Sequence, residues 1–88
     1  MLTKDIFEDE IIVTNPSTFD EVKRAAEGLK SRKPAIVNLN RLNADERMWA
    51  AHFLNGVVFA INGSSREIQK WIFLYSPNGV SVKLEPED

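Results

Sequence analysis

The sequence contains no cysteine, which excludes disulfides, thiolate metal sites and thiol nucleophiles. It contains one histidine, His52, without a second histidine or a nearby carboxylate at ligand spacing. We therefore expect His52 to be buried or to lie at an interface rather than to act in catalysis. Only four glycines occur, and they are too scattered to form a phosphate-binding loop. The chain is not expected to be an enzyme or to hold a metal or cofactor.

Long apolar runs are also absent, and none approaches the roughly 20 residues that a membrane-spanning helix requires. The first ten residues are acidic and have no apolar centre, so no signal peptide is predicted. Charge of one sign is equally scarce, because 11 basic and 13 acidic residues give a net charge of −2. This balance argues against a nucleic-acid-binding protein, which would carry a basic surface.

What is present is typical of one small globular domain. Hydrophobic residues make up 43% of the 88 positions and charged residues 27%, which excludes a disordered chain. The patterned part runs over residues 11–84. We expect an acidic tail at 1–10 and a short tail at 85–88.

Two helices are predicted from their capping residues. Either Thr18 with Glu21 or Ser17 with Asp20 forms a capping box for the first helix, which Pro34 prevents from continuing. The second helix begins after a cap at Asn43 with Glu46 and ends at Asn62-Gly63. Its apolar positions recur in steps of three and one, as expected of one buried stripe, and are Ala50, Phe53, Leu54, Val57, Val58 and Ile61.

Apolar runs bounded by turn residues predict the strands. The turn Pro77-Asn78-Gly79 marks a hairpin between the last two of them. A mixed segment, Ser65–Lys70, precedes this hairpin. The predicted strands are Ile11–Thr14, Ala35–Leu39, Trp71–Tyr75 and Val80–Leu84.

This order, βαβαβββ, predicts an α/β (α+β) two-layer sandwich. A mixed sheet of about five strands would carry two helices on one face, with its first two strands parallel. Three of the strands are apolar at consecutive positions, so both of their faces are expected to be covered. Because two helices cover only one face, the other face predicts self-association, sheet against sheet.

The second helix carries more apolar surface than its core stripe needs. Trp49, Gly56 and Ala60 lie within about 40° of one another on the helix, flanked by His52 and Phe59. A glycine inside a helix costs about 1 kcal/mol relative to alanine, which close approach of another backbone can offset. The patch therefore predicts a helix-mediated contact between copies. The alternative is a broad core stripe that tolerates its glycine.

The aromatic strand offers a second surface. Trp71, Phe73 and Tyr75 alternate onto one of its faces. Such a row is either part of the core or the floor of a groove that binds a peptide, because aromatic side chains bury a large area at low entropic cost. The sequence pattern leaves both interpretations open.

Four segments, in this order and spacing, resemble the conserved C-terminal core domain of the SepF family of cell-division proteins. The resemblance covers about Ile11 to Leu84. It rests on Asn15-Pro16 followed by Phe19, on Ile36-Val37-Asn38-Leu39, on Phe53-Leu54-Asn55-Gly56 leading to Ala60-Ile61-Asn62-Gly63, and on Ile72-Phe73-Leu74-Tyr75-Ser76-Pro77.

The resemblance implies a cytoplasmic adaptor at the division site, on the inner face of the cell membrane. It would self-associate as a homodimer or larger homo-oligomer and bind the C-terminal tail of FtsZ, tethering or bundling FtsZ filaments. Phe73 falls near the expected docking position for that tail, so Trp71, Phe73 and Lys70 are the expected partner-binding residues. Trp49, His52, Gly56, Phe59 and Ala60 are the expected self-association residues.

Two features depart from the family pattern. Family members carry an N-terminal amphipathic helix that binds membrane, and the acidic residues before Ile11 do not resemble one. Membrane contact is therefore expected only through a segment absent from this sequence. His52 stands where the family often has aspartate, so the resemblance does not decide whether this chain forms dimers or longer polymers. The main alternative function is that of a small dimeric α/β ligand-binding regulatory module. Such a module would have a concave polar pocket.

Overall fold

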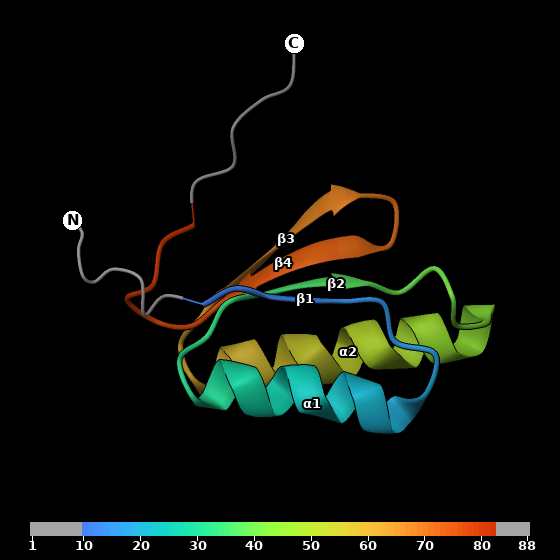
Figure 1. Ribbon diagram of the computed structural model, residues 1–88, viewed down its shortest axis with the longest axis horizontal. Coiled ribbons are helices and arrows are strands. Elements are labelled where there is room, and N and C mark those ends of the chain that lie inside the picture. Colours follow the sequence, from blue (N-terminus) through green and yellow to red (C-terminus); the bar gives the residue numbers. More distant parts are fainter. Residues whose placement is uncertain (1–9, 83–88) are drawn as a thin grey trace, which may run out of the picture.

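The computed structural model describes residues 10–82 and places both helices on one face of a single sheet (Figure 1). The sheet has the strand order β1-β2-β4-β3. This is the predicted two-layer α+β class, with four strands in the described part of the chain. The elements are β1 (Ile12–Thr14), α1 (Phe19–Lys30), β2 (Ala35–Asn38), α2 (Ala44–Ala60), β3 (Ser64–Gln69) and β4 (Ile72–Ser76).

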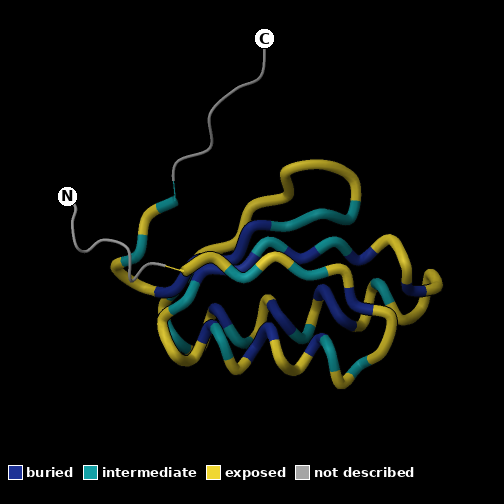
Figure 2. The backbone as a smooth tube through the Cα atoms, in the orientation of Figure 1, coloured by how far each residue is buried: buried dark blue, intermediate teal, exposed yellow. Residues whose placement is uncertain are grey.

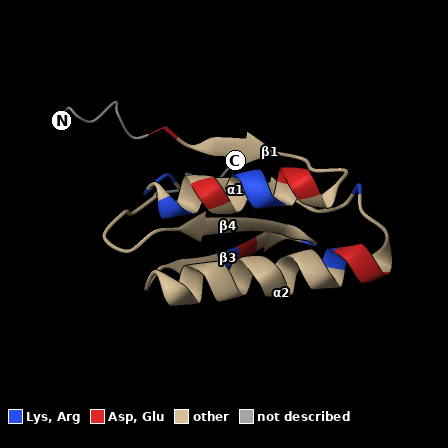
Figure 3. Cartoon of the chain, turned by 90° about the horizontal axis from the view of Figure 1, so that it is seen from below, with Lys and Arg blue, Asp and Glu red and all other residues tan. Residues whose placement is uncertain are grey.

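The sheet is mixed because its connections differ. β1 and β2, which α1 connects, pair in parallel as predicted. β4 then lies between β2 and β3 and is antiparallel to both. α1 covers the β1 side of the sheet and α2 the β3 side (Figure 3).

Both helices begin at the predicted caps. The Thr18 hydroxyl accepts a hydrogen bond from the Glu21 backbone N–H at 3.3 Å, which selects Thr18 as the cap of α1. In α2 the capping box is complete: the Asn43 side chain accepts from the Glu46 N–H at 2.8 Å, and the Glu46 carboxylate accepts from the Asn43 N–H at 3.1 Å. These bonds satisfy N–H groups that lack partners inside a helix.

α2 ends as predicted at Asn62-Gly63, with the two residues in different roles. Asn62, not the glycine, has the left-handed backbone, with φ 59°. The Gly63 N–H donates to the Val58 carbonyl at 2.7 Å. Gly63 is needed for space, because a Cβ there would collide with the Ser76 carbonyl of β4.

The core lies between the sheet and the helices, where the buried sides of α1 and α2 face the strands (Figure 2). Three of the six apolar positions expected on α2 are fully buried and three are partly buried against them. The predicted stripe is therefore confirmed. The largest fully buried side chains are Tyr75, Leu29, Leu39, Leu54, Val22 and Val37.

The predicted hairpin is in the wrong place. The segment assigned as mixed, Ser65–Lys70, is mostly β3, and the hairpin joins it to β4. Trp71, expected to begin the aromatic strand, lies in the turn with φ 62°. A bulky residue in this backbone region is uncommon, so the aromatic run predicted an uninterrupted strand from Trp71. That prediction was wrong at Trp71.

The turn at Pro77-Asn78-Gly79 does form, with a hydrogen bond from the Val80 N–H to the Pro77 carbonyl at 3.1 Å. Residues 80–82 after it are not a strand, which contradicts the first part of the predicted strand Val80–Leu84. The rest of that strand, the tail 85–88 and residues 1–9 of the acidic tail lie outside the described residues. The described Val80–Val82 segment instead lies beside Leu74 and Ser76 of β4.

The helix-free face of the sheet carries apolar side chains, as expected from the consecutive apolar positions. Ile36 pairs with both Val13 and Leu74 and shares this face with them. Val13 is 73% exposed, whereas Leu74 is buried beside the Val80–Val82 segment. One end of this face therefore shares a hollow with the Val80–Val82 segment, whereas the β1 end is open to solvent.

Candidate functional site

The aromatic row formed by Trp71 of the turn and by Phe73 and Tyr75 of β4 lies on the helix-covered face of the sheet. Phe73 is directly opposite Val37, and Tyr75 is opposite Ala35, and both of these β2 residues belong to the core. The ring centroids are 6.2 Å apart for Trp71 and Phe73 and 5.8 Å for Phe73 and Tyr75. Exposure changes along the row, because Tyr75 is fully buried while Trp71 and Phe73 are half-buried.

The exposed end of this row is fixed by its neighbours. The Trp71 N–H donates to the Glu67 carboxylate at 3.1 Å, and its carbonyl accepts from the Leu39 N–H at 2.8 Å. The Arg47 guanidinium of α2 lies 5.3 Å from the Trp71 ring centroid, within range of a cation–π interaction. These contacts hold Trp71 in its left-handed conformation and place both charges beside the exposed aromatic surface.

Lys70 lies in the same turn and is exposed. Its carbonyl accepts a hydrogen bond from the Asn40 side chain at 3.2 Å, so the backbone is held while the ammonium group faces solvent. The structure thus brings the three expected partner-binding residues, Lys70, Trp71 and Phe73, to one end of the sheet. Their role in binding remains a prediction.

The buried end of the row holds an unusual hydroxyl. The Tyr75 Oη is buried and has no hydrogen-bond partner among the described residues. Burial raises the pKa of Tyr75 well above its ordinary value, and the Glu67 carboxylate raises it further. Tyr75 is therefore a neutral core residue, and its hydroxyl lowers stability where it stands.

The outer surface of α2 holds the expected self-association residues. Phe59 is 85% exposed and Trp49 is 51% exposed, which is unusual for large apolar side chains. A Cβ on Gly56 would meet nothing within 4 Å, so no neighbour within the chain requires this glycine. His52 and Ala60 are also exposed, so of the two placements expected for His52, buried or at an interface, the structure excludes the buried one. Their role in self-association remains a prediction.

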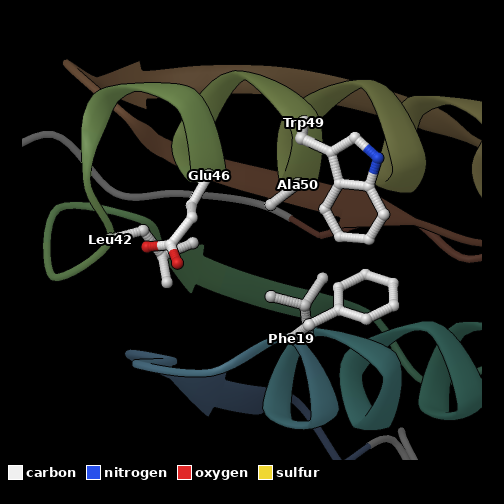
Figure 4. A pocket seen from close by; sticks show the side chains of 6 residues that line it. Phe19, Leu42, Glu46, Trp49 and Ala50 are labelled. Atoms are coloured by element: carbon white, nitrogen blue, oxygen red, sulfur yellow. The ribbon is translucent and has the colours of Figure 1, made fainter.

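A cavity of about 260 Å³ opens between the two helices and was not predicted from the sequence (Figure 4). Only Glu46 contributes a charge to its lining, which is otherwise apolar. The Phe19 ring lies 3.9 Å from the Trp49 ring, centroid to centroid, and forms one wall of this cavity. Helical spacing assigned Phe19 to the core, and nothing in that pattern distinguishes a cavity wall from a filled interior. The cavity is lined by Phe19, Val22, Leu42, Glu46, Trp49 and Ala50.

Residues 10–82 hold neither a cluster of metal-ligating side chains nor a membrane-spanning helix. No group of three or more histidine or acidic side chains in this range is placed to hold a metal ion. No helix among them is long and apolar enough to cross a membrane.

Comparison with known proteins identifies the family. A family model described as "Cell division protein SepF" matches residues 11–82. The chain belongs to the SepF family. SepF 2 of Desulforamulus reducens is 40% identical over 73 residues, and SepF of Symbiobacterium thermophilum is 36% identical over 73 residues. These matches cover 83% of this chain but 45% and 36% of the two relatives, so the chain spans less than half of either.

Solved SepF structures share the fold. A SepF-like protein from Pyrococcus furiosus has a TM-score of 0.68 at 23% identity, covering 84% of this chain and 93% of that one. SepF from Methanobrevibacter smithii, solved in complex with FtsZ-CTD, has a TM-score of 0.65 at 14% identity, covering 85% and 98%. The α+β arrangement of two helices on a mixed sheet is therefore that of SepF, a family of cell-division proteins.

Proposed function

We propose that this SepF-family chain is a cell-division adaptor that binds the C-terminal tail of FtsZ and self-associates. One observation carries the proposal: a half-exposed aromatic pair, Trp71 and Phe73, in a family with a member solved in complex with FtsZ-CTD. The adaptor would act in the cytoplasm at the division site, on the inner face of the cell membrane. It makes and breaks no bond.

The aromatic pair has the properties of a peptide-docking surface. Trp71 and Phe73 offer rigid apolar area, which gives binding energy at low entropic cost. Arg47 places a positive charge 5.3 Å from the Trp71 ring, the exposed Lys70 precedes Trp71 in the turn, and the Glu67 carboxylate accepts from the Trp71 N–H. A short tail segment with apolar side chains and flanking carboxylates would complement this surface.

Self-association would multiply the effect of each weak contact. If two copies pack through the outer surface of α2, each pair presents two peptide sites. Two tails on one filament could then be held together, because the second binding event occurs at a high effective concentration. Gly56 and Phe59 are the residues that we propose for this contact, since both are exposed on a surface without charge.

The proposal is tested by titrating the chain with a fluorescent peptide that carries the C-terminal tail of FtsZ from the same host. Phe73→Ala should weaken binding at least about tenfold, because hot-spot aromatics contribute 2 kcal/mol or more. Ile72→Ala is the matched control: it is equally half-buried on the same strand but points to the helix-free face. Equal loss in both variants would contradict the proposed surface.

Two further variants separate docking from folding. Lys70→Glu changes an exposed side chain that has no packing role, so weaker binding with an unchanged melting temperature would place the peptide at the turn. Phe19→Ala opens the cavity between the helices. Loss of binding in Phe19→Ala but not in Phe73→Ala would move the peptide to that cavity. Strong binding by all of the variants would reject both sites.

A further inference from the structure

Three of the four glycines in this chain follow an asparagine, at Asn55-Gly56, Asn62-Gly63 and Asn78-Gly79. The asparagine of such a pair can lose its side-chain amide without any enzyme. The reaction needs the glycine N–H to be deprotonated and free to approach the asparagine Cγ. Glycine favours this step because it has no side chain to hinder the approach. The structure treats the three pairs very differently.

Two of the pairs are protected by hydrogen bonds at the attacking nitrogen. Gly56 lies inside α2, where each backbone N–H donates to the carbonyl four residues earlier. The Gly63 N–H donates to the Val58 carbonyl at 2.7 Å, and its Cα is packed against the Ser76 carbonyl. Attack by the Gly56 nitrogen therefore requires the interior of α2 to open first, and attack by the Gly63 nitrogen requires the end of α2 to open.

The third pair lacks this protection. Asn78 and Gly79 are exposed, and the Gly79 N–H donates no hydrogen bond to any residue of the described chain. A cleft of about 370 Å³, lined in part by Arg32, Gly79 and Val80, gives solvent access to the turn. The turn is therefore open to water and to hydroxide.

Arg32 adds an activating contact. Its Nη1 donates to the Asn78 carbonyl oxygen at 2.9 Å, and this carbonyl belongs to the peptide group that contains the Gly79 nitrogen. When that nitrogen loses its proton, negative charge is shared with the carbonyl oxygen. A guanidinium donor stabilises the charged form more than the neutral one, since hydrogen bonds to charged groups are the stronger kind.

We propose that Asn78 is a site of spontaneous deamidation and that Arg32 accelerates the reaction. Hydroxide takes the Gly79 amide proton, the nitrogen attacks Asn78 Cγ, and a new C–N bond closes a succinimide ring. The Cγ–Nδ2 bond breaks, and ammonia leaves after gaining a proton from water. Water then opens the ring to give aspartate or isoaspartate, so the net reaction consumes one water and releases one ammonia.

The product changes the helix-free face of the sheet. Isoaspartate adds a methylene to the backbone of the Pro77–Val80 turn, whose hydrogen bond is 3.1 Å long. This turn directs the Val80–Val82 segment along Leu74 and Ser76. Deamidation would therefore shift the segment that lines the hollow at this end of the sheet, slowly and irreversibly.

The test is incubation of the purified chain at mildly alkaline pH, followed by peptide mapping with mass spectrometry. Asn78 should convert at least about fivefold faster than Asn62 or Asn55, because breaking a protecting hydrogen bond costs about 1 kcal/mol or more. In denaturant the three rates should converge. Faster conversion of Asn62 or Asn55 in the folded chain would overturn the site.

Arg32→Ala tests the activating contact. It should slow conversion at Asn78 about tenfold and leave the other two rates unchanged, which serve as internal controls. Arg32→Lys keeps the charge and should restore part of the rate. If Arg32→Ala left the Asn78 rate unchanged, or raised it, the guanidinium would restrain the turn rather than activate it, and that part of the proposal would be wrong.

Discussion

The two helices cover the same face of one sheet, but their solvent-facing surfaces differ in chemistry: that of α1 is charged and that of α2 is largely uncharged. Each buries fully enclosed side chains against the strands, Leu29 on α1 and Leu54 on α2. The outer surface of α1 alternates acidic and basic residues along its length, whereas α2 has no Asp, Glu, Lys or Arg after Arg47 (Figure 3). The charged residues of α1 are Asp20, Glu21, Lys23, Arg24, Glu27 and Lys30.

This difference indicates that the outer surface of α1 is adapted to solvent, whereas the outer surface of α2 is suited to contact with a partner. The charges of α1 pair locally, as in Lys23 with Asp20 at 3.6 Å and Lys30 with Glu27 at 3.9 Å. Such exposed pairs add little stability but keep the surface hydrated. α2 instead exposes Phe59 and half of Trp49, which hydration disfavours unless a partner covers them. The contact surface of the chain is therefore expected on α2.

The inner sides of the two helices should respond alike to truncation. Leu29→Ala and Leu54→Ala each remove a fully buried side chain, so each should lower the free energy of unfolding by about 3 kcal/mol. Denaturant titration at low protein concentration measures both. A loss in one helix alone would show that only that helix belongs to the stable core.

The seam between the helices and the sheet contains the unpartnered Tyr75 hydroxyl. Tyr75→Phe should raise the free energy of unfolding by about 1 kcal/mol, because it removes a buried polar group without a partner among the described residues.

The raised pKa of Tyr75 also predicts alkaline instability. The neutral folded form is favoured below the unfolded pKa of about 10, and this contribution is lost as pH rises above it.

Denaturant titrations between pH 8 and 11, as an approximate range around the tyrosine pKa, check this second effect. Tyr75→Phe should be less sensitive to alkali than the parent chain. An identical pH dependence in the two proteins would mean that another group causes the alkaline loss.

Replacing the glycine of each helix with alanine should change stability by a smaller amount, and by different amounts in α1 and α2. Gly56→Ala should stabilise the single chain by about 1 kcal/mol, since nothing lies within 4 Å of the added Cβ. Gly28→Ala on α1 should gain less, because its Cβ meets the Ile12 side chain and must displace it. Thermal melts at low concentration compare the two. If close packing of α2 against another copy uses Gly56, the same change should weaken association.

Surface truncation should have the smallest effect on folding. Phe59→Ser and Lys23→Ser both change exposed side chains, so each should alter the free energy of unfolding by no more than about 0.5 kcal/mol. Only Phe59→Ser should lower the average mass in sedimentation velocity. An unchanged mass in Phe59→Ser would remove α2 as the association surface.

The sequence was informative wherever local chemistry decides the structure. Capping at Thr18 and Asn43 and the apolar stripe of α2 follow from side chains near one another in sequence, and the parallel pairing of the first two strands follows from the helix that connects them. The hairpin did not follow. Its turn uses Trp71 at φ 62°, held by Glu67 and Leu39, and no turn-favouring residue marks it.

The candidate site was predictable in residue type but not in arrangement. Alternation placed Trp71, Phe73 and Tyr75 on one face, but only the packing of β2 shows that this face is the helix-covered one. The cavity beside Phe19 depends on how closely two helices approach, which periodicity does not encode. His52 was expected to be buried or to lie at an interface, and the helix places it on the outer surface, where an interface position is still the prediction.

The most direct test of the account is calorimetric titration of the chain with the FtsZ C-terminal tail of its own host, beside a scrambled peptide of equal composition. We expect saturable micromolar binding to the native tail and none to the scrambled one. Absence of binding by a folded chain that still self-associates would contradict the adaptor function. The shared SepF fold would then serve another partner.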